Sequence, residues 1–250
     1  MIMAEGFIYG QSGSLQADYS NMPYTDELDG LFEMDSLDLS NSLWINKITN
    51  QNNFTIIGGT EYDNALCLNN GEYGYCSAET YPYVLYLVVK KSQLEENKFL
   101  FGTSASASGF AMWNNGNKQG SFIEFSSFNS NVYYYAEDLN KYYAVSVMFT
   151  PTHNTITNDS IGSSTALCFI NGEYCGCTQI YTNMSLNNGY KEFLNRITLN
   201  AQLKVNDLSN ITYGCVYPTY IRALAFGKKQ TVEQVVENSK YLYKKYCEEN

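Results

Sequence analysis

Short apolar runs separated by turn residues recur along the chain from about residue 28 onward, and this pattern predicts a series of β-strands. The run 83–89 is apolar at consecutive positions, which is typical of a central strand covered on both faces. The run 142–149 predicts another long strand that stops at Thr150-Pro151, because proline cannot donate a ladder hydrogen bond. Many short strands at regular spacing favour an antiparallel sandwich over a parallel α/β sheet.

One segment near the C-terminus has helical periodicity instead. Thr231 is a favourable N-cap, and Gln234 at the third helical position completes a capping box. Lys244 and Lys245 lie near the end of the segment, where the helix dipole favours cations. We therefore predict one α-helix from about 231 to 247, with apolar residues at helical spacing: Val232, Val235, Val236, Leu242 and Tyr243.

Two similar segments, 65–76 and 166–177, each centre on an Asn-Gly pair. Asn-Gly is the strongest short signal for a type I′ hairpin turn, so both are interpreted as hairpins. In the second, Cys168 is predicted to face Cys175, with Cys177 on the same side. A disulfide and part of a zinc site are both conceivable there, but three buried free thiols are favoured.

Composition narrows the classes of function. The chain has 250 residues, a net charge of −10 and no basic cluster, so we expect no nucleic-acid partner. The longest apolar run, 81–89, is too short to span a bilayer, so no membrane insertion is expected. There are 23 tyrosines, a residue type that offers rigid, amphipathic contact area for binding.

The first 27 residues differ from the rest because they show little periodicity. We expect an N-terminal arm over 1–27 and one sandwich domain over 28–250. The arm is interpreted either as a disordered or edge-strand terminus, or as a segment that attaches the domain to an assembly. Residues 1–6 have no basic n-region, so we expect no signal peptide and reduced cysteines.

Six segments then follow one another in a suggestive order: the strand 29–35; Trp44 with Asn46 and 52–55; the turn region 66–75; residues 140–147; the turn region 167–176; and 220–224 leading into 231–238. Over about residues 28–246 this order resembles the laminin-G-like, concanavalin-A-like lectin/glucanase superfamily. Asn46 stands where that family usually has Asp, and Tyr142 or Tyr143 stands in the place of a Trp. The resemblance implies an all-β fold, an antiparallel jelly-roll β-sandwich with one C-terminal α-helix. Members bind glycans or proteins, and relatives occur in surface adhesins and phage virion proteins.

Few residues suggest catalysis or metal binding. Glu33-x-Asp35-x-x-Asp38 approaches the carboxylate set of laminarinase-like glycosidases, but its spacing differs and it coincides with the opening strand of the binding family. His153 is the only histidine and lies in a polar stretch without a nucleophile and acid arrangement. Oxygen-rich positions such as Asp63-Asn64 do not form a compact calcium loop. No catalytic residue, metal or cofactor is predicted.

The predicted ligand-binding residues are aromatic and amide side chains near a turn: Trp113, Asn114, Asn115, Tyr133 and Tyr135. Aromatic rings stack on the apolar C–H faces of sugars, and asparagine amides bond sugar hydroxyls in both directions. The alternative is that Trp113 and some of these tyrosines belong to the core, because one face of each sheet in a sandwich is buried.

These observations favour a non-enzymatic recognition or structural module. The leading hypothesis is a phage virion protein of the tail or head decoration, assembled in the host cytoplasm, that binds bacterial surface carbohydrate. Its N-terminal arm would contact other virion proteins. The alternatives are a purely structural decoration protein without glycan binding, and a glycan-cleaving enzyme of the laminarinase-like type.

Overall fold

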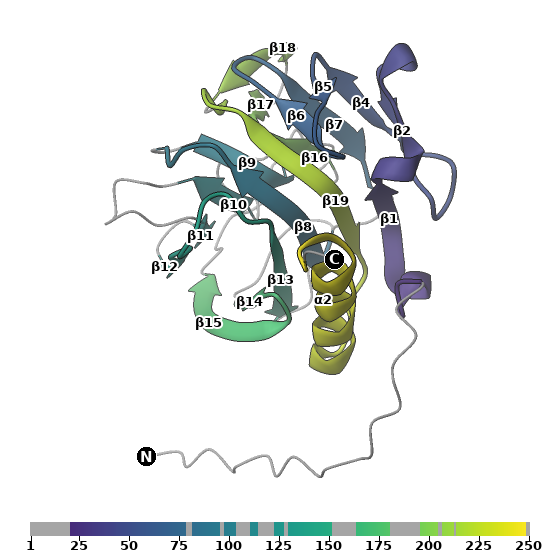
Figure 1. The fold of residues 1–250 in the computed structure, drawn as a ribbon. Helices are drawn as coiled ribbons and strands as arrows, with labels where there is room; N and C mark the ends of the chain where they lie inside the picture. The colour runs from purple at the N-terminus through teal and green to yellow at the C-terminus, as the bar shows by residue number, and fades with distance from the viewer. Residues whose placement is uncertain are drawn as a thin grey trace, which may run out of the picture.

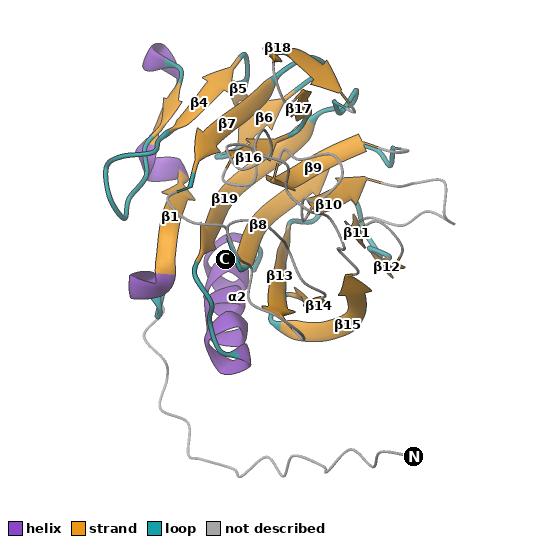
Figure 2. Cartoon of the chain, turned by 180° about the vertical axis from the view of Figure 1, so that it is seen from behind, coloured by secondary structure: helices purple, strands orange, loops and turns teal. Residues whose placement is uncertain are grey.

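The computed structural model describes residues 21–78, 82–95, 98–103, 111–114, 123–127, 130–151, 164–180, 196–204, 207–212 and 214–248. These residues form two antiparallel β-sheets stacked face to face, with one α-helix near the C-terminus. Figure 1 shows this helix in front of β8, β13 and β19, and Figure 2 shows the same helix behind the strands. The predicted all-β, jelly-roll-like sandwich with a C-terminal helix is confirmed.

The first sheet, which we call the helix-covered sheet, has the order β15-β14-β13-β8-β19-β6-β5, and β1 also pairs with β19. Its strands are antiparallel throughout. Their bounds are β1 Leu28–Glu33, β5 Thr60–Glu61, β6 Leu66–Leu68, β8 Val84–Lys91, β13 Tyr143–Pro151, β14 Ser164–Ile170, β15 Glu173–Ile180 and β19 Thr219–Gly227.

The second sheet, the opposite sheet, has the order β12-β11-β10-β9-β16-β7-β4-β3-β2, and β17 and β18 form a separate pair. Three short 3-10 helices lie near the start: η1 Thr25–Glu27 precedes β1, η2 Met34–Ser36 connects β1 to β2, and η3 Leu39–Asn41 connects β2 to β3. The strand bounds are β2 Leu37–Asp38, β3 Leu43–Trp44, β4 Phe54–Ile57, β7 Tyr73–Ser77, β9 Lys98–Thr103, β10 Ala111–Asn114, β11 Ile123–Ser127, β12 Ser130–Tyr134, β16 Arg196–Leu199, β17 Gln202–Lys204 and β18 Asp207–Thr212.

Strand β8 explains why the run 83–89 is apolar at every position. Leu85, Leu87 and Val89 belong to the core between the two sheets. The alternate residues, 84, 86 and 88, belong to a second core between the helix-covered sheet and the helix. Successive strand residues face opposite sides, so a strand with apolar contacts on both sides needs no polar positions.

Helix α2, Val232–Tyr246, covers the outer face of the helix-covered sheet. The Thr231 hydroxyl oxygen accepts a bond from the Gln234 backbone N–H, and the Gln234 side-chain oxygen accepts one from the Thr231 backbone N–H. The predicted capping box is therefore confirmed. The helix buries Val235, Tyr241 and Leu242 against the sheet. No helix in the described part of the chain is long and apolar enough to cross a membrane.

The Asn70-Gly71 segment is not a hairpin, so that prediction is wrong. The turn joins β6 in the helix-covered sheet to β7 in the opposite sheet, and only Gly71 has a positive φ, of +80°. A type I′ turn needs positive φ at both central residues. Asn171 and Gly172 meet this requirement with φ of +54° and +81°, so the second segment is the predicted hairpin between β14 and β15.

The cysteine pairing predicted within that hairpin is also wrong. The register shifts by one residue beyond Phe169, so Cys168 lies opposite Gly176 rather than Cys175. An extra residue on one strand is a β-bulge, which re-aims the side chains that follow. All three thiols are free, but only Cys168 is buried, whereas Cys177 is exposed.

The end of β13 differs from the sequence pattern, and part of the predicted arm falls outside the described residues. Strand β13 continues through Thr150 to Pro151, which pairs with Ser164 at the strand end, where proline is tolerated. Residues 1–20 of the predicted arm lie outside the described residues, as does His153. Met22 is buried in the core beneath α2, and the Tyr24 backbone N–H donates to Asn238 Oδ1 at 3.1 Å.

Candidate functional site

The predicted ligand-binding residues lie near one end of the opposite sheet. The backbone register places Trp113 of β10 and Tyr133 of β12 opposite the same residue, Glu124 of β11, so they share one row across three strands. Asn114 ends β10, and Asn115 lies outside the described residues. Tyr135 follows β12 and is exposed. The structure thus brings Trp113 and Tyr133 into one row, and their role in binding stays a prediction.

The carboxylates of the glycosidase-like motif lie on three different elements. Glu33 ends β1, Asp35 lies in η2 and Asp38 lies in β2. Asp38 accepts bonds from the Asn41 backbone and side chain and so caps η3. Asp35 forms an ion pair of 2.8 Å with Lys47 on the surface. The motif therefore does not present its carboxylates from alternate positions of one strand.

Glu33 instead joins β1 to α2. Its side chain is 3% exposed and accepts bonds from Lys245 Nζ at 2.7 Å and Lys47 Nζ at 2.8 Å. The hydroxyls of Tyr246 and Tyr241 also donate to Glu33, at 2.6 and 3.1 Å. Burial alone would raise the pKa of Glu33, but hydrogen bonds from Lys245, Lys47 and Tyr246 outweigh it and lower this pKa to about 2. Glu33 is thus an ionised structural carboxylate at neutral pH.

A pocket of about 510 Å³ lies beside the C-terminal end of α2. We call it the Tyr142 pocket. Five segments that are distant in the sequence form its walls, together with the last residues of the helix. They contribute Asp63, Lys90 of β8, residues 140–143 at the start of β13, Asn171 of the hairpin turn and Arg222 of β19. This volume is within the range of about 300–1,000 Å³ that is common for small-molecule sites.

A β-bulge places Arg222 in the pocket wall. The register between β19 and β8 shifts between Ile221 and Ala223, so Arg222 is the extra residue. Its two terminal nitrogens donate to backbone carbonyl oxygens of Tyr246, at 2.8 Å, and Asp63, at 3.3 Å. The guanidinium carbon lies 3.8 Å from the centre of the Tyr142 ring. The guanidinium is therefore held in a fixed orientation.

Two donors in the pocket wall have no hydrogen-bond partner among the described residues: the Tyr142 hydroxyl and the Arg222 Nε. Tyr142 is only 7% exposed. An unsatisfied buried polar group costs about 1–3 kcal/mol, so such groups are rare in proteins without a reason. Burial raises the pKa of Tyr142 to about 12, although the charge of Arg222 and the approach of its side chain to the hydroxyl oxygen act in the opposite direction. The hydroxyl therefore keeps its proton and can donate it to an acceptor.

An aromatic surface continues from the pocket. The Lys90 ammonium lies 4.9 Å from the ring centres of both Tyr142 and Tyr220. The Tyr220 ring in turn packs against Tyr62, with 5.9 Å between ring centres. Tyr62 is 62% exposed, so most of its ring faces solvent. We call these two residues the Tyr62–Tyr220 pair.

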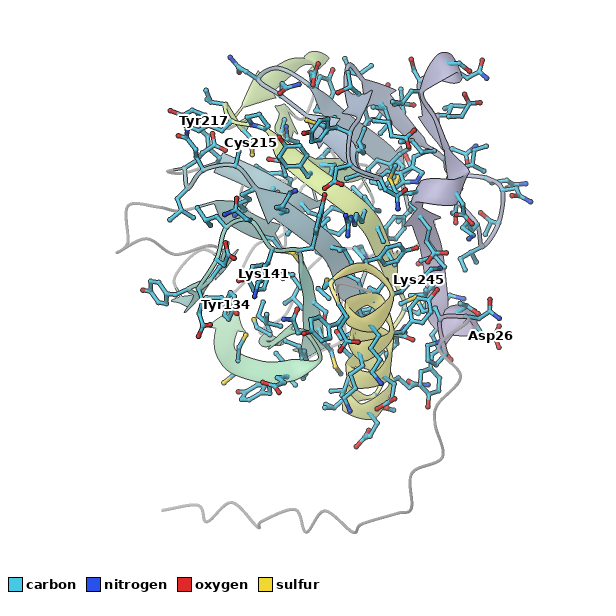
Figure 3. The ribbon with its side chains drawn as sticks, viewed as in Figure 1. Asp26, Tyr134, Lys141, Cys215, Tyr217 and Lys245 are labelled. Atoms are coloured by element: carbon cyan, nitrogen blue, oxygen red, sulfur yellow. The ribbon has the colours of Figure 1, made fainter. Side chains whose placement is uncertain are left out.

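The charge of the pocket contrasts with that of the whole chain, which is −10. Three cations, Lys90, Lys141 and Arg222, line the pocket against two carboxylates, Asp63 and Glu248. Asp63 Oδ2 is 3.4 Å from Lys90 Nζ and 3.7 Å from a terminal nitrogen of Arg222. One exposed carboxylate therefore forms long ion pairs with both cations. Figure 3 labels Lys141 on one side of the C-terminal end of α2 and Lys245 on the other.

The sequence did not predict that these residues form one pocket. Arg222 and Tyr142 stood out only as parts of the family-like segments, and Asp63 only as a weak calcium candidate. The order apolar, charged, apolar at 221–223 matches the ordinary alternation of a strand, so it gives no local signal of the bulge. Among the described residues no cluster of histidine, cysteine and carboxylate side chains fits a metal ion.

Comparisons with known proteins place the fold. No protein-family model matches the chain, and no curated protein matches its sequence. Among solved structures, a sialidase of Trypanosoma rangeli in complex with sialic acid is 11% identical, with a TM-score of 0.57, over 90% of this chain and 34% of the sialidase. Domain 4 of AbnA, a GH43 extracellular arabinanase from Geobacillus stearothermophilus in complex with arabinotriose, is 14% identical, with a TM-score of 0.53, over 85% of this chain and 98% of that domain.

The binding domain of botulinum neurotoxin serotype D is 15% identical, with a TM-score of 0.50, over 88% of this chain and 51% of that domain. The chain spans about a third of the length of the sialidases it matches. At such identities the likeness shows a shared lectin-like β-sandwich fold. Sites and activities have to be argued from the residues of this chain.

Proposed function

We propose that this chain is a non-enzymatic recognition module that binds carbohydrate through the Tyr142 pocket and the Tyr62–Tyr220 pair. The carrying observation is a pocket with unpaired buried donors next to an exposed tyrosine ring. Sugar hydroxyls and ring oxygens accept hydrogen bonds from such donors, and the apolar faces of sugars stack on aromatic rings. Asn140 and Asn171 add amide groups at the rim.

Two further observations support the proposal. Domain 4 of the arabinanase, which is similar to this chain over 98% of its length, was solved with arabinotriose bound. The one buried carboxylate of the glycosidase-like motif, Glu33, is engaged by two lysines and two tyrosines that belong to the fold. A carboxylate held as an ion by four donors is a poor general acid, since it does not carry a proton at neutral pH.

A glycan array followed by isothermal titration calorimetry with a retained glycan tests the proposal. Tyr62→Ala removes an exposed ring, so the fold is kept and affinity is expected to fall about tenfold or more. Tyr174→Ala is the matched control, since Tyr174 is 57% exposed and packs on Phe169 with the same ring separation of 5.9 Å. The proposal would be contradicted if the protein bound no glycan on the array. It would also be contradicted if the two substitutions lowered the affinity equally.

The row of Trp113 and Tyr133, with Asn114, Asn115 and Tyr135 nearby, is a second predicted contact surface for the same glycan. Trp113→Ala measures its contribution in the same titration. If Trp113→Ala abolishes binding and Tyr62→Ala leaves it unchanged, the sugar site lies on β10–β12 instead of at the Tyr142 pocket.

The biological setting is proposed from the sequence. We propose a phage virion protein of the tail or head decoration, with the N-terminal arm as its attachment to other virion proteins. The support is the apolar content of the first 27 residues, including Phe7, Ile8 and Tyr9, which exceeds that of a spacer. Deleting residues 1–20 leaves Met22 in place. The truncated protein is expected to keep its melting temperature and to be absent from assembled particles, and normal incorporation would contradict the attachment role.

A further inference from the structure

We propose that the ligand of the Tyr142 pocket is a sugar that carries a carboxylate, held between Lys90, Lys141 and Arg222. This inference rests on the proposed carbohydrate binding and adds the chemical class of the ligand. It also predicts which group of the sugar enters the pocket and which part stays on the Tyr62–Tyr220 pair.

The charge of the pocket selects for an anion. Acidic residues outnumber basic residues by 25 to 15 in the chain, yet cations outnumber carboxylates by three to two along the pocket. Lys141 is exposed and forms no ion pair with the described residues. Because Asp63 neutralises Lys90 and Arg222 only at 3.4 and 3.7 Å, an entering carboxylate can approach both cations more closely.

The hydrogen-bond donors of Arg222 and Tyr142 predict where in the pocket the carboxylate would bind. One N–H of each Arg222 terminal nitrogen is used by the carbonyl of Tyr246 or Asp63, and Nε has no acceptor among the described residues. The Tyr142 hydroxyl is the second free donor, and its ring lies against the same guanidinium. A carboxylate has two oxygens that accept several bonds, so one such group can satisfy both donors. The site is held in place before the ligand binds, which lowers the cost of binding.

The remaining features suit the neutral part of a sugar. Asn171 Oδ1 accepts the Ala144 N–H at 3.0 Å, which fixes the amide and leaves its NH2 group for a hydroxyl. The Tyr62 ring offers an exposed face beyond Lys90 for the apolar side of a sugar ring. A free inorganic anion would use only the cations and would leave these groups unused.

Calorimetric titration with matched pairs of probes tests the class of ligand. Trigalacturonic acid is compared with its methyl ester, in which each carboxylate is replaced by an uncharged ester, and 3′-sialyllactose is compared with lactose. The acid of at least one pair is expected to bind at least tenfold more tightly than its neutral partner. The preference should weaken as salt is raised, because the cations are partly exposed. The better pair shows whether a uronic or a sialic acid fits.

Three variants locate the effect. Tyr142→Phe removes an unpaired hydroxyl, so the melting temperature should be equal or higher while the affinity for the acid falls at least threefold. Lys141→Gln should weaken binding of the acid at least threefold and leave the neutral partner unchanged. Lys228→Gln is the matched control, since Lys228 is also exposed but follows the far end of β19, and it should change neither affinity.

The outcomes separate the two proposals. Equal affinity for an acid and its neutral partner in both pairs overturns this inference, while the carbohydrate-binding function stands. Failure of every acidic and neutral glycan on the array overturns both. Inorganic sulfate that competes as tightly as trigalacturonic acid identifies a simple anion site and overturns the inference. A Tyr142→Phe protein that folds normally and binds the acid as tightly as the wild type overturns it as well.

Discussion

Replacing Glu33 by glutamine is expected to destabilise the fold strongly at neutral pH and only weakly in acid. Glu33 is 3% exposed and accepts bonds from two lysines and two tyrosines that join β1 to α2. Glutamine has nearly the same shape, so the substitution removes the negative charge without leaving a cavity. The four donors would then face a neutral amide.

The pKa of Glu33 gives the magnitude. Its fall from the ordinary value of 4.5 to about 2 corresponds to about 3 kcal/mol of unfolding free energy. Because the folded-state pKa is lowered, this stability is fully present above about pH 5 and is lost as the pH falls toward 2. The difference between wild type and Glu33→Gln should therefore be about 3 kcal/mol at pH 7 and about half of that at pH 3.

Urea denaturation followed by circular dichroism at several pH values between 7 and 3 measures this difference. At pH 7 the melting temperature should also fall by roughly 6 to 12 °C for a chain of this size. Asp35→Asn is the control, since Asp35 shares Lys47 but is 69% exposed, and its effect should stay below about 1 kcal/mol. A Glu33→Gln protein that matches the wild type at pH 7, or a difference that does not shrink in acid, would refute the reasoning.

Three other results are expected from local geometry. Thr231→Ala should lower the unfolding free energy in urea by about 1 kcal/mol, because it removes the N-cap bond of α2. Gly172→Ala should cost about 1–3 kcal/mol in the same assay, because φ is +81° and an added Cβ would lie 2.5 Å from Lys240 Cγ; an unchanged midpoint would rule out the type I′ turn. Iodoacetamide labelling followed by mass spectrometry should modify Cys177 well before Cys168, since Cys177 is exposed, whereas burial raises the pKa of Cys168.

The sequence by itself determined the features that a few neighbouring residues encode. The capping box at Thr231 and Gln234 set the start of α2, and the apolar run around β8 indicated a strand covered on both faces. Asn171 and Gly172 adopt the backbone that their residue types favour. These predictions held because turn chemistry, capping and hydrophobic period act within one turn or one strand.

Only the tertiary structure decided which strands pair and which side chains meet. The turn at Asn70-Gly71 resembles the second one in sequence, yet β6 pairs with β5 and β19 in one sheet, while β7 pairs with β4 and β16 in the other. One-residue bulges turned Cys168 away from Cys175 and moved Arg222 into a pocket wall. Tyr142, Lys90 and Asp63 meet Arg222 from separate segments, and such a site depends on long-range register that no local pattern records.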